Sequence, residues 1–308
     1  MHQCSPWLVV SCLGLAAPAA AWPPPEQRSA RQRAPTVQAP AVYPPGHAPA
    51  DYVAHLRKLR PTLKKLRGRF SVVIERPFVV IGDGGNVSGY ARGFIRKVVT
   101  LLKKDFFDKD PRILDIYLFK DHRSYYENAR RLTGRTPDTP YGFFSSGLDA
   151  LVMNIKPGAG TLSHEIVHPF IEANFPDCPP WFNEGLGSLY EAVWWRRGKI
   201  WGFVNWRLPG LQRAIRAGSV PSFKTLMAQN EEQFYEEDPG TNYAQSRYLL
   251  FYLQNRGLLR PYYRELLKHR RTDPTGYTTL KRLLGVEDMR AFQRRWEREM
   301  LKLRWPPR

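Results

Sequence analysis

Residues 161–170 read TLSHEIVHPF, and the interpretation of the whole chain starts from this stretch. On a helix, His164 and His168 are four positions apart and lie on one face, so both imidazoles can reach a single metal ion. Glu165 directly follows the first histidine, where its carboxylate can take a proton from a water molecule beside that ion. A purely structural site has no need of this base, so the pattern indicates a catalytic metal site.

A catalytic zinc site takes three protein ligands and keeps one position open. Residues 169–174 (PFIEAN) contain neither the glycine nor the histidine that a histidine third ligand would require. Residues 180–191 (PWFNEGLGSLYE) instead offer the carboxylate of Glu184 from a second helix, and Gly185 and Gly187 would let the two helices approach closely. We therefore expect one Zn²⁺ per chain, held by His164, His168 and Glu184; the alternative is a solvated Glu184.

H-E-x-x-H followed by a short connection and W-x-N-E-G resembles the gluzincin metallopeptidases, and most closely the peptidase MA-like group. The resemblance extends over roughly residues 70–305, including TNYAQSRYLLFYLQ at 241–254. It implies a small sheet followed by two ligand helices and a zincin-type helical half. It also implies zinc-dependent hydrolysis of peptide bonds by a metal-activated water, with Glu165 as the general base.

The resemblance also implies a tyrosine or histidine that stabilises the oxyanion from a later helix. Tyr243 opens the matching helix and is our candidate, with Tyr248 and Arg247 as rivals and a packing tyrosine as the alternative. Ser188 stands where thermolysin-like enzymes place an aspartate that orients a ligand histidine, so the partner of that histidine is not identified. Pro169, directly after the second ligand, lacks an N–H and tends to kink a helix.

The substrate is less well defined by the sequence. Residues 151–155 (LVMNI), just before the metal helix, could pair with an extended peptide at a sheet edge or form a core strand. This stretch lacks the glutamate with which aminopeptidases bind the substrate amine, which favours internal cleavage of a peptide or protein. Cys178 could be a reactive thiol near the metal, but a small buried residue in a turn is favoured.

The composition is strongly basic, with 47 Lys and Arg against 28 Asp and Glu, a formal charge of +19. Such a charge attracts polyanions in general. A second hypothesis is therefore a catalytically inactive gluzincin-like protein that binds anionic cell-envelope polymers through its basic helices. A third is hydrolysis of a non-peptide amide in cell-wall material. The absence of an RNA-recognition motif and of Cys/His finger spacing argues against nucleic acid.

Residues 1–21 contain an apolar run that ends in Ala19-Ala20-Ala21, which predicts a signal peptide and export to the periplasm or the medium. Lipid attachment at Cys12 is the alternative. Residues 22–50 are proline-rich and predict a disordered linker. No later segment is long and apolar enough for a transmembrane helix. The remaining residues 51–308 predict one domain, an α/β part at 51–158 and a helical part at 159–308 with the metal site.

The α/β part is expected to hold a small mixed or antiparallel sheet, so the fold class is α+β. Apolar runs predict a hairpin at 70–82 and strands at 113–119, 141–146 and 151–155. Apolar spacings of three and four predict helices at 51–66, where Pro61 would separate two short helices, and at 87–107 and 121–133. After Gly160 only helices are expected: 161–174, 180–196, 206–216, 223–228, 240–255, 258–269, 277–284 and 287–303.

Overall fold

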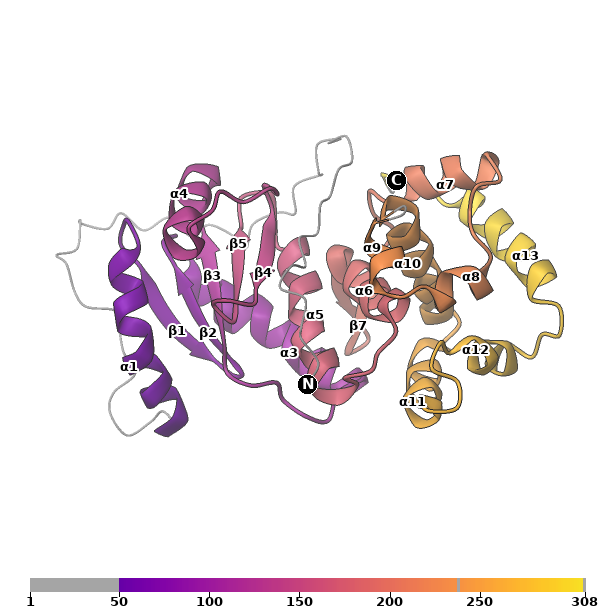
Figure 1. Cartoon of the computed structure of the whole chain (residues 1–308), viewed down its shortest axis with the longest axis horizontal. Helices are drawn as coiled ribbons and strands as arrows, with labels where there is room; N and C mark the ends of the chain where they lie inside the picture. The colour runs from indigo at the N-terminus through magenta and orange to yellow at the C-terminus, as the bar shows by residue number, and fades with distance from the viewer. Residues whose placement is uncertain (1–49, 237–238, 307–308) are drawn as a thin grey trace. The chain divides into compact units, whose positions relative to one another are not determined.

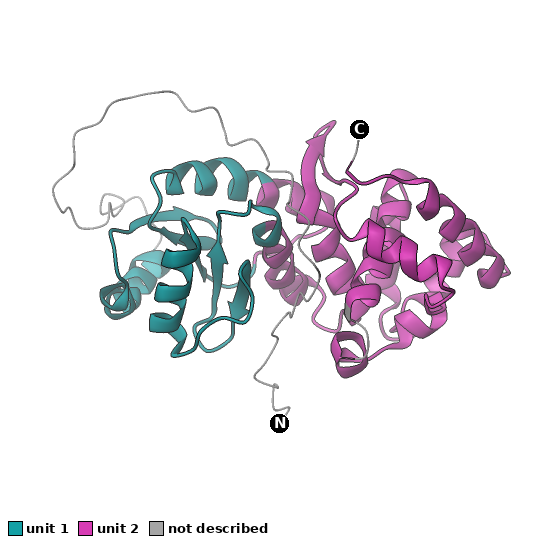
Figure 2. Ribbon diagram, turned by 90° about the horizontal axis from the view of Figure 1, so that it is seen from above, with its two compact units in different colours: residues 1–11, 18–97, 111–162 teal, residues 12–17, 98–110, 163–308 magenta. Residues whose placement is uncertain are grey.

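The computed structural model describes residues 50–236 and 239–306, which form two compact units (Figure 2). The first unit contains residues 50–97 and 111–162, and the second contains residues 98–110 and 163–306. The sequence analysis placed the end of the α/β part at residue 158, whereas the first unit ends at Leu162 and residues 98–110 belong to the second unit. The predicted signal peptide, nearly all of the predicted linker, and Cys12 lie outside the described residues.

The first unit is built on one five-stranded sheet (Figure 1). Its strands are β1 (Ser71–Glu75), β2 (Phe78–Gly82), β3 (Leu114–Phe119), β4 (Gly142–Ser145) and β5 (Ala150–Asn154), in the order β1-β2-β3-β5-β4. The three central strands are parallel and the two outer pairs antiparallel, so the sheet is mixed. The expected α+β class is confirmed.

Of the two alternatives for residues 151–155, the core strand is the one observed, because β5 lies inside the sheet. One side of β5 is hydrogen-bonded to β3 and the other to β4. All five of its residues are buried. A strand with both edges occupied has no backbone groups left for an extended substrate, so this segment is a core strand.

Helices α1 (Ala50–Lys65) and α4 (His122–Thr133) pack against the sheet in one hydrophobic core. Pro61 was expected to separate two short helices, but α1 is one continuous helix with this proline inside it. The leucines at 56, 59 and 63 all contact this core, and packing along one face keeps the helix continuous through the proline. Asp121 caps α4 by accepting a hydrogen bond from the Ser124 amide. Residues 87–105 are helical throughout, as α2 (Val87–Gly89), the π-helix η1 (Tyr90–Ile95) and α3 (Arg96–Asp105).

The second unit is mainly helical, as expected. Its helices are α5 (Gly160–Asn174, whose first turn belongs to the first unit), α6 (Pro180–Leu189), the 3₁₀ turn η2 (Tyr190–Ala192), α7 (Leu208–Arg216), α8 (Phe223–Ala228), α9 (Glu231–Glu236), α10 (Pro239–Asn255), α11 (Leu259–His269), α12 (Tyr277–Leu284) and α13 (Met289–Lys302). Helix α9 was not anticipated. In the part of the chain that the structure describes, no helix has the length and apolarity needed to cross a bilayer.

A helix over residues 180–196 was a wrong prediction, because α6 ends at Leu189 and a β-hairpin follows. Its strands are β6 (Val193–Arg196) and β7 (Lys199–Gly202), paired antiparallel. The two turn residues, Arg197 and Gly198, both have positive φ (51° and 69°), as a tight two-residue hairpin turn requires. Valine and tryptophan at 193–195 favour a strand, and this local preference ends the helix.

Candidate metal centre

Helices α5 and α6 bring the three predicted ligands together in the second unit. The rings of His164 and His168 lie on one face of α5 with their centroids 4.9 Å apart. Nε2 of His164 is 3.2 Å from Oε2 of Glu184, and Nε2 of His168 is 3.9 Å from the same oxygen. Two ligands at ~2.0–2.1 Å from a tetrahedral zinc ion are about 3.3 Å apart. The donor set and its spacing therefore fit one zinc ion.

Two glycines of α6 allow this approach, each toward a different helix. A Cβ on Gly187 would lie 3.1 Å from the ring of His164, so a larger residue there would force the imidazole or the helix to shift by a few tenths of an ångström. A Cβ on Gly185 would lie 3.1 Å from Cβ of Ser246 on α10. The expectation that both glycines bring the two ligand helices together thus applies to Gly187, while Gly185 serves the packing of α6 on α10.

Each ligand histidine has a second partner at its other ring nitrogen. Nδ1 of His168 is 2.8 Å from Oδ1 of Asn183. Nδ1 of His164 is 3.3 Å from Oε1 of Glu191, within ion-pair distance. In metal sites such outer contacts determine which nitrogen faces the metal. Glu191 is therefore the candidate for the carboxylate that orients His164, which Ser188 cannot supply.

Glu191 is in turn held by Arg207. The guanidinium donates to both carboxylate oxygens, from Nη2 at 2.6 Å and from Nε at 2.9 Å. The side-chain amide of Asn205 adds a third donor at 2.9 Å. Arg207 also lies over the rings of Tyr243 and Trp206, at 5.0 and 4.3 Å from their centroids. A chain of contacts thus extends from His164 through Glu191 to Arg207.

Tyr235 was missed by the sequence analysis. Its hydroxyl donates a 2.7 Å hydrogen bond to Oε1 of Glu184, which leaves Oε2 facing the histidines. Tyr235 lies on the short helix α9, whose sequence EEQFYE carries no metal-site motif. Asn183 and Glu191, by contrast, lie in residues 180–191 together with Glu184 and could have been identified from the sequence.

Buried charges dominate the electrostatics of the site. Burial alone would raise the pKa of Glu184, but the two histidines and the Tyr235 hydroxyl outweigh it and lower this pKa to about 2. Burial would lower the pKa of His164, yet the carboxylates of Glu184 and Glu191 raise it to about 10. The site therefore gathers negative charge around the imidazoles, which is the environment that a divalent cation prefers.

Glu165 differs from the other carboxylates. It is 4% exposed, and burial raises its pKa, although the charges of His164 and His168 act in the opposite direction. A general base works best when its pKa is close to the working pH, and burial moves a glutamate in that direction. A raised pKa is compatible with the role of general base that the sequence analysis assigns to Glu165.

The three candidates for oxyanion stabilisation differ in what their side chains contact. The ring of Tyr243 is 6.5 Å from that of His164, and the side chain is buried. Tyr248 instead bonds to the backbone of Asn205 through its hydroxyl, and Arg247 donates to the backbone carbonyls of Ser188 and Phe203. Both rivals therefore hold the scaffold, and Tyr243 remains the candidate beside the site.

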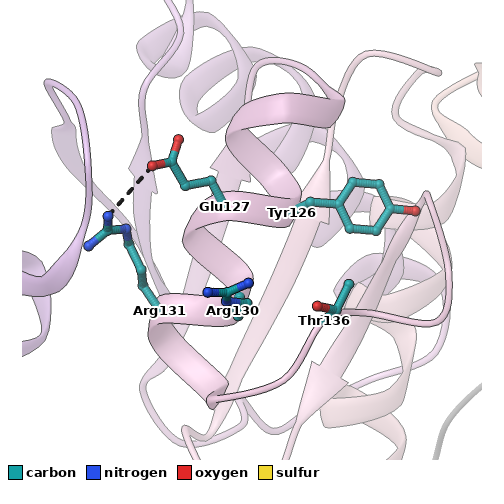
Figure 3. A pocket seen from close by; sticks show the side chains of 5 residues that line it. All are labelled: Tyr126, Glu127, Arg130, Arg131 and Thr136. Carbon is teal, nitrogen blue, oxygen red and sulfur yellow. Dashed lines mark ion pairs between the residues drawn. The ribbon is translucent and has the colours of Figure 1, made fainter.

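Two other features do not contribute to this centre. Burial raises the pKa of the free thiol of Cys178, which favours the inert reading of this residue. A shallow groove on α4 in the first unit is lined by Tyr126, Glu127, Arg130, Arg131 and Thr136 (Figure 3). Arg131 pairs with Glu127 there at 3.6 Å, and no second acidic or histidine side chain lines the groove to make a metal site.

Comparison with known proteins adds no family assignment: no family model and no curated protein matches the sequence. The gluzincin resemblance therefore rests on the motif and on the geometry of its residues.

Proposed function

We propose that this chain is a secreted, zinc-dependent gluzincin-type metallopeptidase that hydrolyses peptide bonds within polypeptide chains. The observation that carries the proposal is the convergence of His164 Nε2, His168 Nε2 and Glu184 Oε2, whose donor atoms lie within 4.8 Å of one another. Two imidazoles and a carboxylate are the ligand set of catalytic zinc sites such as that of thermolysin.

A zinc ion in this site would supply Lewis acidity and lower the pKa of a bound water to about 7. The chain's own residues divide the remaining work. Glu165 would accept the proton of the attacking water on a carboxylate oxygen and deliver it to the nitrogen of the departing amine. Tyr243 is the proposed donor to the oxyanion. Glu191, Asn183 and Tyr235 would hold the ligand side chains in position.

Metal content is the first test of the proposal. We expect about one zinc per chain in the purified protein from Trp22 onward, and loss of zinc in both His164→Ala and Glu184→Ala. Glu165→Gln should keep the metal, because the base is not a ligand. If reconstituted protein holds no zinc, the proposal fails. If Glu184→Ala retains zinc and His164→Ala loses it, the third ligand is a different residue.

Activity separates the peptidase from a binding protein. Cleavage of casein should occur in the wild type and fall about 10²–10⁴-fold in Glu165→Gln. Salt-sensitive binding to an anionic polymer that survives Glu165→Gln, without cleavage of casein, would instead support the inactive binding protein.

A further inference from the structure

The exposed large apolar side chains of residues 50–236 and 239–306 lie in one short segment. They are Trp194, Phe203 and Trp206, which are 39%, 43% and 45% exposed. Four of the nine tryptophans in the chain fall between residues 194 and 206. Exposed apolar side chains that gather in this way mark a surface that binds a partner or a membrane.

The hairpin β6–β7 presents these aromatic side chains together with positive charge. Trp194 is paired with Trp201 across the two strands, and Arg196 is paired with Lys199. Because side chains alternate along a strand, these four residues share one face. Figure 2 shows the two strands projecting from the helices of the second unit.

The charge around this hairpin is strongly positive. Residues 192–208 contain no Asp or Glu, and the hairpin turn adds Arg197, which is exposed. Lys104 joins this group by donating to the carbonyl of Gly198 at 3.1 Å. The nearby carboxylate of Asp105 is buried, where it accepts from the Ile200 amide and pairs with Arg260. The exposed residues of the hairpin itself therefore carry cations and no anion.

We propose that the hairpin β6–β7 is a docking element for an anionic lipid surface. Tryptophan prefers the headgroup level of a bilayer, where its ring meets the acyl chains and its N–H meets water. Lysine and arginine are attracted to anionic headgroups at the same depth. The guanidinium of Arg196 over the ring of Trp201, 5.6 Å from its centroid, places both groups at one level.

An apolar occupant explains the surface better than a polyanion does. An acidic polymer without aromatic rings would be attracted by the cations alone, and Phe203 has no polar group to offer it. A single-stranded nucleic acid would add base stacking on the exposed rings, and the DNA arm of the test below separates it from a lipid surface. Burial of Phe203 and Trp194 in the acyl region would remove their apolar area from water. This inference is independent of the proposed peptidase activity.

The test uses the full chain and sedimentation with vesicles of phosphatidylcholine, with and without phosphatidylglycerol. We expect binding to the anionic vesicles and quenching of tryptophan fluorescence by brominated lipid. Arg196→Glu with Lys199→Glu should weaken binding about tenfold or more. Trp194→Ser with Phe203→Ser should also weaken it about tenfold or more, since two buried aromatic side chains are lost. Circular dichroism confirms that each variant folds.

The matched control is Arg294→Glu with Arg298→Glu on α13, which reverses two exposed charges of the same unit. It should bind the anionic vesicles as the wild type does. Equal loss in this control would show a general charge effect and overturn the proposal. The absence of binding to the anionic vesicles would also overturn it. If the protein then binds polyphosphate or DNA, and this binding survives Trp194→Ser with Phe203→Ser, the partner is a polyanion and not a lipid surface.

Discussion

The hydroxyl of Tyr235 donates a 2.7 Å hydrogen bond to Oε1 of Glu184, across 51 positions of sequence. This bond leaves Oε2 of Glu184 facing the two histidines. Removal of a side chain that holds a metal ligand in position commonly weakens metal binding about 10- to 100-fold. The contact distinguishes the two oxygens of Glu184, so that one defined atom is left as the candidate metal donor.

We therefore expect Tyr235→Phe to weaken zinc binding about 10–100-fold, while the fold remains intact. The measurement is competition with a chromophoric chelator. Tyr252→Phe, which removes a hydroxyl from α10 away from Glu184, is the control and should leave the affinity unchanged. Equal affinity in Tyr235→Phe and the wild type would show that this hydrogen bond does not position the ligand.

Gly187→Ala should displace His164, because the new Cβ would meet the imidazole at 3.1 Å. Overpacking of this kind costs about 1–3 kcal/mol, which corresponds to about 5- to 150-fold in metal affinity if the strain falls on the metal-bound state. The same competition titration measures it. Gly93→Ala is the matched control, since a Cβ there meets nothing within 4 Å. Unchanged zinc binding in Gly187→Ala would mean that the helices separate at no cost to the site.

Arg207→Met should destabilise the metal-free protein by about 3–5 kcal/mol, because it leaves the largely buried carboxylate of Glu191 without its cation. Urea denaturation measures the change. The double variant with Glu191→Gln should recover part of the loss, since the uncompensated charge is removed. Simple additivity of the two substitutions would show that the ion pair contributes no coupling.

The stability of the first unit should fall as the pH rises through the pKa of His55. The hydrogen bond that His55 donates to the Asp115 carboxylate raises this pKa above the ordinary 6.5 and outweighs burial; Lys58 lowers it and Asp149 raises it to a smaller extent. A folded-state pKa above the unfolded value adds stability that is full below the unfolded pKa and disappears above the folded one.

His55→Gln should therefore cost more stability at about pH 6 than at about pH 9. Denaturant unfolding at the two pH values measures the difference, and His122→Gln, whose ring contacts the Asn154 amide instead of a carboxylate, serves as the control. An equal loss at both values would mean that the charge on His55 does not contribute to folding.

Local periodicity accounts for much of what the sequence predicted correctly. Four-residue spacing places His164 and His168 on one helical face whatever the rest of the chain does, because helix geometry is local. The strands at 71–82 and 114–119 were predicted for a similar reason, since short runs of Val, Ile and Phe between turn residues favour strands. Two predictions from local signals were wrong. Pro61 was expected to break a helix, but packing on the sheet keeps α1 continuous. Residues 180–196 were expected to form one helix, but a hairpin with a two-residue turn follows α6 at 193–202.

The sequence by itself determined which residues are the candidate metal ligands and the candidate base: His164, His168, Glu184 and Glu165 stand in two short motifs. Only the tertiary structure decided how those side chains are oriented. Tyr235 and Arg207 reach the site from segments far along the chain, and Gly187 is required by the ring that packs on it. Such contacts depend on how helices pack in space, and packing between distant segments leaves no periodic pattern in the sequence.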